Sequence, residues 1–425
     1  MSDRRRSGRG GSGARGSAWR DDRLWQAGFL VGSALGAAAT VLGRRAEKIA
    51  RQGLVDWSAA ERVAVGRLKS APGALTTEEL RATEPIYAAA MERIVPALSA
   101  ALGTELPGVV ERSAVVDRAG WVHANVATFA QLIGQLETEL LDQVMPSSGG
   151  LAKATMALAN RWVTTRQLGF LLGFMGSKVL GQYDLALLTA ESTPGKLLFV
   201  EENIRQTATA LDVPIDPFRT WIALHETTHA FEFEAHPWLR PYLADRLERQ
   251  LRLFGREASS LGREALRGLG RAIRGENDGA EHWMERLMTD EQRRLFRETQ
   301  AVMSLLEGFS DYVMDEVGRD LVPGVERISA KFHERRHARR SPFERAVMRL
   351  TGMDVKLEQY RKGEQFVSAI AAAGGPAALN RLWSGPELLP QPAEIDDPAA
   401  WLRRAGLAAG AGDDAGATAG DGAPA

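Results

Sequence analysis

Cysteine is absent from this chain of 425 residues. Disulfide bonds, thiolate nucleophiles, iron–sulfur clusters and cysteine-based zinc sites are therefore excluded, and any metal must be held by histidine and carboxylate side chains. Histidine is scarce as well, at seven residues, so a metal site can form in few places. Neither sign of charge is in excess, because 53 Lys and Arg residues face 54 Asp and Glu residues. The charge balance gives no reason to expect a nucleic-acid partner.

Both ends of the chain lack the apolar residues that a core requires. Residues 1–22 are dominated by Arg, Gly and Ser, and residues 405–425 by Ala, Gly and Asp. Such segments cannot bury enough apolar surface to offset the entropy lost on ordering. We therefore expect a disordered basic arm at the N-terminus and a disordered tail at the C-terminus.

One segment near the N-terminus is long and free of charge. Leu24–Gly43 spans twenty residues, enough to cross a membrane, and Gly28, Gly32 and Gly36 form a ridge of the kind used for helix packing in lipid. Alanine and glycine dilute the run, however, and basic residues flank it on both sides. We expect an Ala/Gly-rich packing helix over 23–54 in a cytoplasmic protein. Membrane association through the uncharged run is the alternative.

Most of the chain between residues 55 and 404 has helical periodicity, which predicts one mainly α domain. Long helices are expected over 113–141 and 151–180, on either side of a Pro-Ser-Ser-Gly-Gly break. The exception is Leu197–Val200, a short apolar run that follows a Pro-Gly pair. That pattern is typical of a strand.

The clearest chemical signal is the sequence His225-Glu226-Thr-Thr-His229. A helix is expected here, from an N-cap at Asp216 to about Ala235. Two histidines four residues apart lie on one helix face, and both can bind one Zn²⁺ at about 2.1 Å. Glu226 lies about 100° round the helix, where a general base can take a proton from a metal-bound water. The alternative is that both histidines are ordinary core or surface groups.

Two histidines leave a third ligand to be found. Glu232 lies seven residues beyond His225, about 10 Å along the helix axis, so it is too far away to hold the same ion and its loss should leave the metal bound. A second helix is expected after the capping box Thr289–Gln292. This helix carries Glu307, predicted to bind zinc, and Asp311, predicted to accept the second ring N–H of a ligating histidine. A solvated acidic stripe is the alternative.

His-Glu-x-x-His at 225–229 followed by Glu-x-x-Ser-Asp at 307–311 is similar to the signature of the gluzincins, the thermolysin-like metallopeptidases. The resemblance implies a zincin-like helical metallohydrolase with a short strand or edge element before its active-site helix. It also implies Glu307 as the third zinc ligand and Asp311 behind it. The long gap between the two motifs implies a helical insertion at about 241–288.

Four segments together resemble an actinobacterial family of zincin-like hydrolases. They are 198–203, 225–239, 307–315 and 352–366, and the resemblance covers roughly residues 55–400. Members are described as zinc-dependent and metalloprotease-like, and one branch is associated with deazaflavin-coenzyme biosynthesis. The resemblance implies a zinc cofactor and a peptide or amide substrate.

The expected reaction is hydrolysis of a peptide or amide bond. Glu226 would take the proton of the attacking water and deliver it to the leaving amine, and Leu197–Val200 would pair with an extended peptide, as sheet edges in zincins do. A catalytically silent helical scaffold that keeps a structural zinc is the alternative. Tyr360 leads the candidates for stabilising the oxyanion or binding substrate. The other candidates are Tyr312, His333 and His337, although the last two stand in a run that suits a solvated basic face.

Overall fold

A computed structural model of the protein describes residues 53–144, 151–183, 196–250, 252–253, 288–337 and 353–407. The chain divides into two compact units. The smaller comprises Met1–Asp56 and Val144–Arg166, and the larger comprises Trp57–Gln143 and Gln167–Ala425. The predicted N-terminal arm and Leu24–Gly43 lie outside the described residues, as does most of the predicted insertion.

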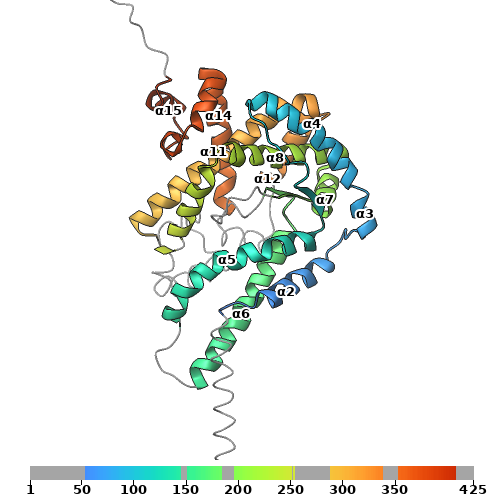
Figure 1. Cartoon of the computed structure of the whole chain (residues 1–425), viewed down its shortest axis with the longest axis vertical. Coiled ribbons are helices and arrows are strands. Elements are labelled where there is room, and N and C mark those ends of the chain that lie inside the picture. Colours follow the sequence, from blue (N-terminus) through green and yellow to red (C-terminus); the bar gives the residue numbers. More distant parts are fainter. Residues whose placement is uncertain are drawn as a thin grey trace, which may run out of the picture. The chain divides into compact units, whose positions relative to one another are not determined.

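Helices make up most of the described chain, so the mainly α class is confirmed. In chain order they are α2 (Trp57–Lys69), α3 (Thr77–Arg81), α4 (Glu84–Leu102), α5 (Arg118–Val144), α6 (Leu151–Gly176), α7 (Glu201–Leu211), α8 (Ile215–Ala235), α11 (Asp290–Leu321), α12 (Val325–His337), α14 (Met353–Leu382) and α15 (Pro398–Arg404), with a 3₁₀ turn at Pro386–Leu388 (Figure 1).

Three short strands form one sheet in the larger unit. They are β1 (Ser113–Val116), β2 (Gly181–Tyr183) and β3 (Leu197–Val200), in the order β1-β3-β2. β3 pairs with β1 in parallel and with β2 antiparallel. The strand predicted at 197–200 is confirmed, but its expected place at a sheet edge is wrong. All four of its residues are buried, as suits a continuous apolar run with a strand on either side.

The helix predicted from residue 113 is also wrong at its start. Ser113–Val116 pairs with β3 residue by residue, and α5 begins only at Arg118. Val115 and Val116 are β-branched, which favours a strand once a partner is available. The partner is about eighty residues further along the chain, so local periodicity could not reveal the pairing.

The two helices near the candidate site begin differently. α11 begins after the capping box that the sequence predicts, with Thr289 Oγ1 accepting from the Gln292 amide at 3.2 Å. α8 begins two residues earlier than expected, at Ile215, and its N-cap is Pro214, which makes no side-chain capping hydrogen bond. Asp216, the predicted cap, lies in the first turn and binds the Arg219 guanidinium at 2.6 Å.

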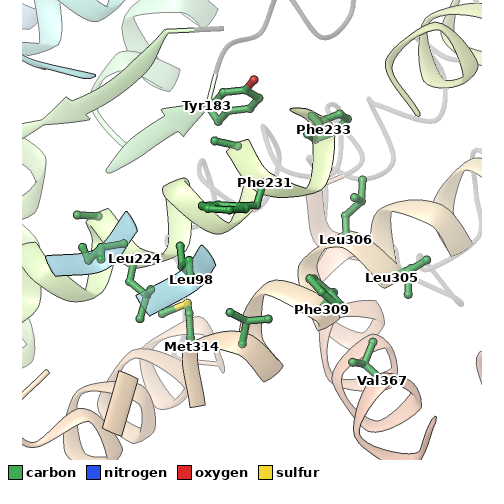
Figure 2. Close-up of a cluster of buried hydrophobic side chains, with 14 of the residues drawn as sticks. Leu98, Tyr183, Leu224, Phe231, Phe233, Leu305, Leu306, Phe309, Met314 and Val367 are labelled. Atoms are coloured by element: carbon green, nitrogen blue, oxygen red, sulfur yellow. The ribbon is translucent and has the colours of Figure 1, made fainter. Parts of the chain in front are cut away.

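The main core joins α4, α8, α11 and α14 to the sheet. Figure 2 shows Leu224, Phe231 and Phe233 of α8, Leu305, Leu306, Phe309 and Met314 of α11, Leu98 of α4, Val367 of α14 and Tyr183 of β2. These apolar contacts fix α8 against α11, which carry the two halves of the predicted metal site. Burial on this scale contributes about 25 cal/mol for each Å² of apolar surface removed from water.

α11 and α14 cross with their backbones in direct contact. A Cβ atom on Gly308 would lie 2.1 Å from the carbonyl carbon of Gly363, and one on Gly363 would lie 1.9 Å from the carbonyl oxygen of Ser304. Only glycine allows such an approach. Glu307 is next to this crossing, so α14 holds in place the segment of α11 that carries it.

A buried polar cluster explains the acidic pair at the start of α7. Glu201 is fully buried and accepts hydrogen bonds from Tyr87 Oη at 2.8 Å and from the Arg219 guanidinium. Glu202 accepts from the backbone N–H of Arg118 at 3.0 Å. Burial raises the pKa of Tyr87 well above its usual range, and the neighbouring Glu201 raises it further. The acidic pair therefore ties α7 to its neighbours.

The smaller unit contains the first part of α6. The Asp56 amide donates to Thr165 Oγ1 at 2.9 Å, which joins this helix to the residues before α2. Trp162 is 60% exposed and carries the Arg166 guanidinium over its ring at 4.6 Å. Among the residues that the structure describes, no helix is long and apolar enough to cross a membrane.

The folded domain extends slightly into the predicted C-terminal tail. Ala405 is buried, and its N–H donates to the carbonyl of Trp401 at 2.8 Å. Gly406 follows with φ at 73°, a left-handed conformation that ends α15. The domain therefore continues to at least residue 407, past the predicted boundary at residue 404.

Candidate metal centre

The His-Glu-Thr-Thr-His sequence lies in the second half of α8. The rings of His225 and His229 are 4.7 Å apart between centroids, and the two side chains are 14% and 15% exposed. Thr227 and Thr228 are fully buried and donate to carbonyl oxygens one turn earlier on α8. The threonines therefore face the core, which leaves the two histidines on the accessible side.

Glu307 of α11 approaches both histidines. Each of His225, His229 and Glu307 offers one ligand atom, and these atoms all lie within 4.8 Å of one another. His225 Nε2 is 4.0 Å from Glu307 Oε2. Ligand atoms on a tetrahedral Zn²⁺ at about 2.1 Å lie about 3.4 Å apart, so only a small closure is needed. The structure brings the three predicted ligands together, and two imidazoles with one carboxylate fit zinc with one position open.

The ring nitrogens that face away from this cluster have partners. His229 Nδ1 is 2.7 Å from Glu232 Oε2, one turn further along α8. His225 Nδ1 is 3.1 Å from Ser310 Oγ and 3.1 Å from Met314 Sδ. These contacts leave the Nε2 atom of each ring for a metal, because a hydrogen bond on one ring nitrogen fixes the tautomer and orients the other.

Glu232 is the first functional residue that the sequence analysis missed. Its helical position rules it out as a ligand, but its carboxylate is buried and orients His229. Its replacement is therefore expected to disturb the site, contrary to the expectation from helix geometry alone. Asp311 is buried on α11, and its charge raises the pKa of Glu232. The signal was available, since a glutamate three residues after a histidine lies on the same helix face.

Negative charge is concentrated around the two histidines. Burial raises the pKa of Glu226 to about 7, although His229 and the Tyr183 N–H lower it. Burial likewise raises the pKa of Glu232 to about 7, against the effect of His229. For His229 itself burial would lower the pKa, but three neighbouring glutamates raise it to about 10. A divalent cation would be stabilised by the same negative charge.

Glu226 turns toward the sheet rather than toward α11. Its side chain is buried, and Oε2 accepts a hydrogen bond from the backbone N–H of Tyr183 at 3.1 Å. Oε1 makes no hydrogen bond to any residue that the structure describes. Gly181 and Tyr183 of β2 are further residues that the sequence analysis did not identify. A strand of three residues beside a long helix leaves no periodic signal.

The remaining candidates stay unassigned. Tyr312 is half-buried on α11, and the charges that affect its pKa are those of Glu316 and Arg319, not those of the metal-site residues. Tyr360 lies in α14, one turn before the helix crossing, and His333 and His337 lie in α12. The side chains of these last three lie outside the described part of the structure. His236 donates to the Glu232 carbonyl at 2.7 Å and stacks on Trp383.

Comparison with known proteins gives two matches. A family model described as zincin-like metallopeptidase matches residues 55–402. A solved structure from Chloroflexus aurantiacus, described as "a putative hydrolase with a novel fold", is 34% identical with a TM-score of 0.61, and the match covers 82% of this chain and 98% of that one. No curated protein matches. Given the match over most of its length, this chain belongs to the family of zincin-like metallopeptidases.

Proposed function

We propose that the protein is a zinc-dependent metallopeptidase that uses Glu226 as its general base. The observation that carries the proposal is the cluster of His225, His229 and Glu307, whose ligand atoms lie within 4.8 Å of one another. Glu226 is next to the first of these ligands in the sequence. Membership of the zincin-like family and similarity to a protein described as a hydrolase support this reading. The deazaflavin association remains a prediction.

The ligand set is of the gluzincin type in this proposal. His225 and His229 come from one helix and Glu307 from another, so the site forms only when α8 packs on α11. When bound, zinc supplies a Lewis acid that acidifies water and polarises a carbonyl group. Glu226 takes the proton of the attacking water and later gives it to the leaving amine.

The outer edge of β2 is the proposed binding position for an extended peptide. β3, which the sequence assigned to this role, has a strand on each side. The amide of Val200 donates to the Leu180 carbonyl at 2.8 Å, so pairing with β3 alternates along β2 and turns the N–H and C=O groups of residues 181 and 183 outward. The Tyr183 N–H is already bound to Glu226 Oε2, so an added strand can use the N–H and C=O groups of Gly181. The edge is next to Glu226, where a scissile bond is needed.

A direct experiment compares wild-type protein with Glu226→Gln. Zinc content is measured for both, and both are incubated with a mixed peptide library. We expect equal zinc in the two proteins, because residue 226 is no ligand. Peptide cleavage should fall by about 10²–10⁴-fold in the variant, because a neutral amide cannot accept a proton. Zinc without cleavage in the wild type would instead support a silent scaffold, and absence of tightly bound zinc would overturn the metal site.

A further inference from the structure

We propose that β2 positions the Glu226 carboxylate, with Gly181 and Tyr183 as its positioning residues. The inference rests on the proposed function, in which Glu226 is the base. It goes beyond that function because it assigns a role to a strand that holds no ligand. Three contacts of β2 with α8 and one with Arg240 carry it.

The first contact is a hydrogen bond to one oxygen of the carboxylate. The Tyr183 N–H donates to Glu226 Oε2 at 3.1 Å. This N–H points outward from the sheet because of the alternation along β2 described above. The Tyr183 N–H is the one hydrogen bond that the Glu226 carboxylate makes within the described residues, so Oε1 has none there. One oxygen is therefore held while the other is left to exchange a proton.

The second contact is a close approach at Gly181. A Cβ atom at this position would lie 2.5 Å from Glu226 Cγ and 2.8 Å from Cδ and Oε1. Real Cβ contacts do not occur at such distances, so any other residue would push the carboxylate away. The glycine is required here for space, and Glu226 is confined between β2 and its own helix.

The third and fourth contacts fix the strand itself. Tyr183 Oη donates to Glu234 Oε1 at 2.6 Å and accepts from the Arg240 guanidinium at 3.2 Å. Glu234 lies on α8 eight residues after Glu226, about 12 Å along the axis. It also receives two hydrogen bonds from Arg112, at 2.7 and 3.0 Å, just before β1. One carboxylate of α8 thereby binds residues from both edges of the sheet.

Apolar packing supports the same attachment. The Tyr183 ring stacks on Phe233 of α8 at 6.2 Å between centroids, and Figure 2 shows Tyr183 beside the end of α8 that carries Phe231 and Phe233. Tyr183 is 6% exposed. Its backbone therefore holds the base while its side chain holds the strand. A glutamate side chain has three rotatable bonds and can adopt many conformations. The contacts with β2 exclude conformations that the carboxylate would otherwise have to abandon before it could accept a proton.

The test is a double-mutant cycle between Gly181 and Glu226. Gly181→Ala should lower peptide cleavage by about 100-fold or more while zinc content stays at the wild-type level, because the added methyl group displaces the base and touches no ligand. It should also lower the Tm in the wild-type background and lower it much less in the Glu226→Ala background, where the collision is absent. Gly66→Ala is the matched control, because nothing lies within 4 Å of a Cβ atom there.

A second measurement does not depend on activity or on the stability of the glycine variant. Hydrogen exchange of the Tyr183 amide should accelerate about 10-fold or more in Glu226→Ala, since the variant loses a hydrogen bond to a charged group. If Gly181→Ala lowers the Tm equally in both backgrounds and exchange is unchanged, the proposal fails. If wild-type protein cleaves no peptide but both effects appear, the positioning holds and the peptidase function fails.

Discussion

Two groups of buried carboxylates in the larger unit differ in the partners that balance their negative charge. Glu201 is bound by Tyr87 and Arg219, so the chain itself supplies a cation. Glu226 and Glu232 are bound by a backbone N–H and by a histidine, and neither has an Arg or Lys partner among the described residues. Burying carboxylates without enough positive charge is costly, and the single charge of His229 cannot balance the three glutamates that surround it. The second group therefore suits a cation from outside the chain, whereas the first is complete.

The difference also separates structural from chemical roles for acidic residues. Both groups lie in segments that resemble the same family, so the resemblance alone does not distinguish them. Their partners do. A carboxylate that forms an ion pair with arginine stabilises the fold. A carboxylate that contacts a metal-ligating histidine contributes to the chemistry of the site. The predictions below change one group at a time.

The largest effect is expected when a metal ligand is removed. Glu307→Ala leaves two histidines on one helix, and zinc affinity should fall by more than the factor of about 100 that loss of a supporting residue causes. Zinc content after dialysis measures the loss. Glu316→Ala on the same helix is the control, because this residue is half-exposed and forms an ion pair with Arg319, one turn further along. Unchanged zinc in the first variant would rule out Glu307 as a ligand.

The next effect concerns stability without metal. Arg219→Met leaves the buried Glu201 short of its main cation and should cost about 3 kcal/mol of unfolding free energy, measured by urea denaturation. Zinc affinity should stay at the wild-type value. Arg205→Met is the matched control, since this arginine binds the same carboxylate from a side chain that is 39% exposed and should cost less than about 1 kcal/mol. If Arg219→Met weakened zinc binding more than it lowered the unfolding free energy, the two groups of carboxylates would not have separate roles.

Sequence spacing predicted the parts of this fold that local rules control. The capping box at Thr289, the strand Leu197–Val200 and the histidine pair of α8 depend on residues within one or two turns of each other. The three predicted zinc ligands also come together in the structure. Their chemical roles remain predictions until metal binding and activity are measured.

Apart from Glu232, whose partner His229 is three residues away, the missed features depend on partners that are distant in the sequence. β1 and β2 have four and three residues, too few for a periodic signal, and each exists because β3 is available to pair. Gly181 is defined by contact with Glu226, and Gly363 by contact with α11. A single sequence shows that such glycines are present but not what approaches them. These long-range contacts, rather than the helices, complete the site.

A smaller effect is expected from the residue that orients His229. Glu232→Gln keeps the shape of the side chain but removes the charge that binds His229 Nδ1, and zinc affinity should fall by about 10–100-fold. Competition with a chelator measures the affinity. Asp311→Asn is the comparison, because the sequence analysis predicted the orienting role for that residue. If Asp311→Asn weakens zinc binding more than Glu232→Gln, the earlier assignment of Asp311 is the better one.

The smallest effect is a pH dependence of stability that arises from the first group, in which Glu201 is bound by Tyr87 and Arg219. The folded-state pKa of Tyr87 is raised well above its usual range of about 10, first by burial and then by Glu201. The folded protein therefore holds this proton at a pH where the unfolded chain has lost it, so the stability that Tyr87 contributes is present below pH 10 and falls as the pH rises. The stability difference between wild type and Tyr87→Phe should shrink by about 1 kcal/mol between pH 9 and 10.5. Urea titrations of both proteins at each pH measure this difference, and subtraction removes the tyrosines and lysines that the two share. A difference that stays constant to pH 10.5 would mean that the phenol ionises as easily in the fold as outside it, and the first group would then not be the closed, charge-balanced cluster that distinguishes it from the metal site.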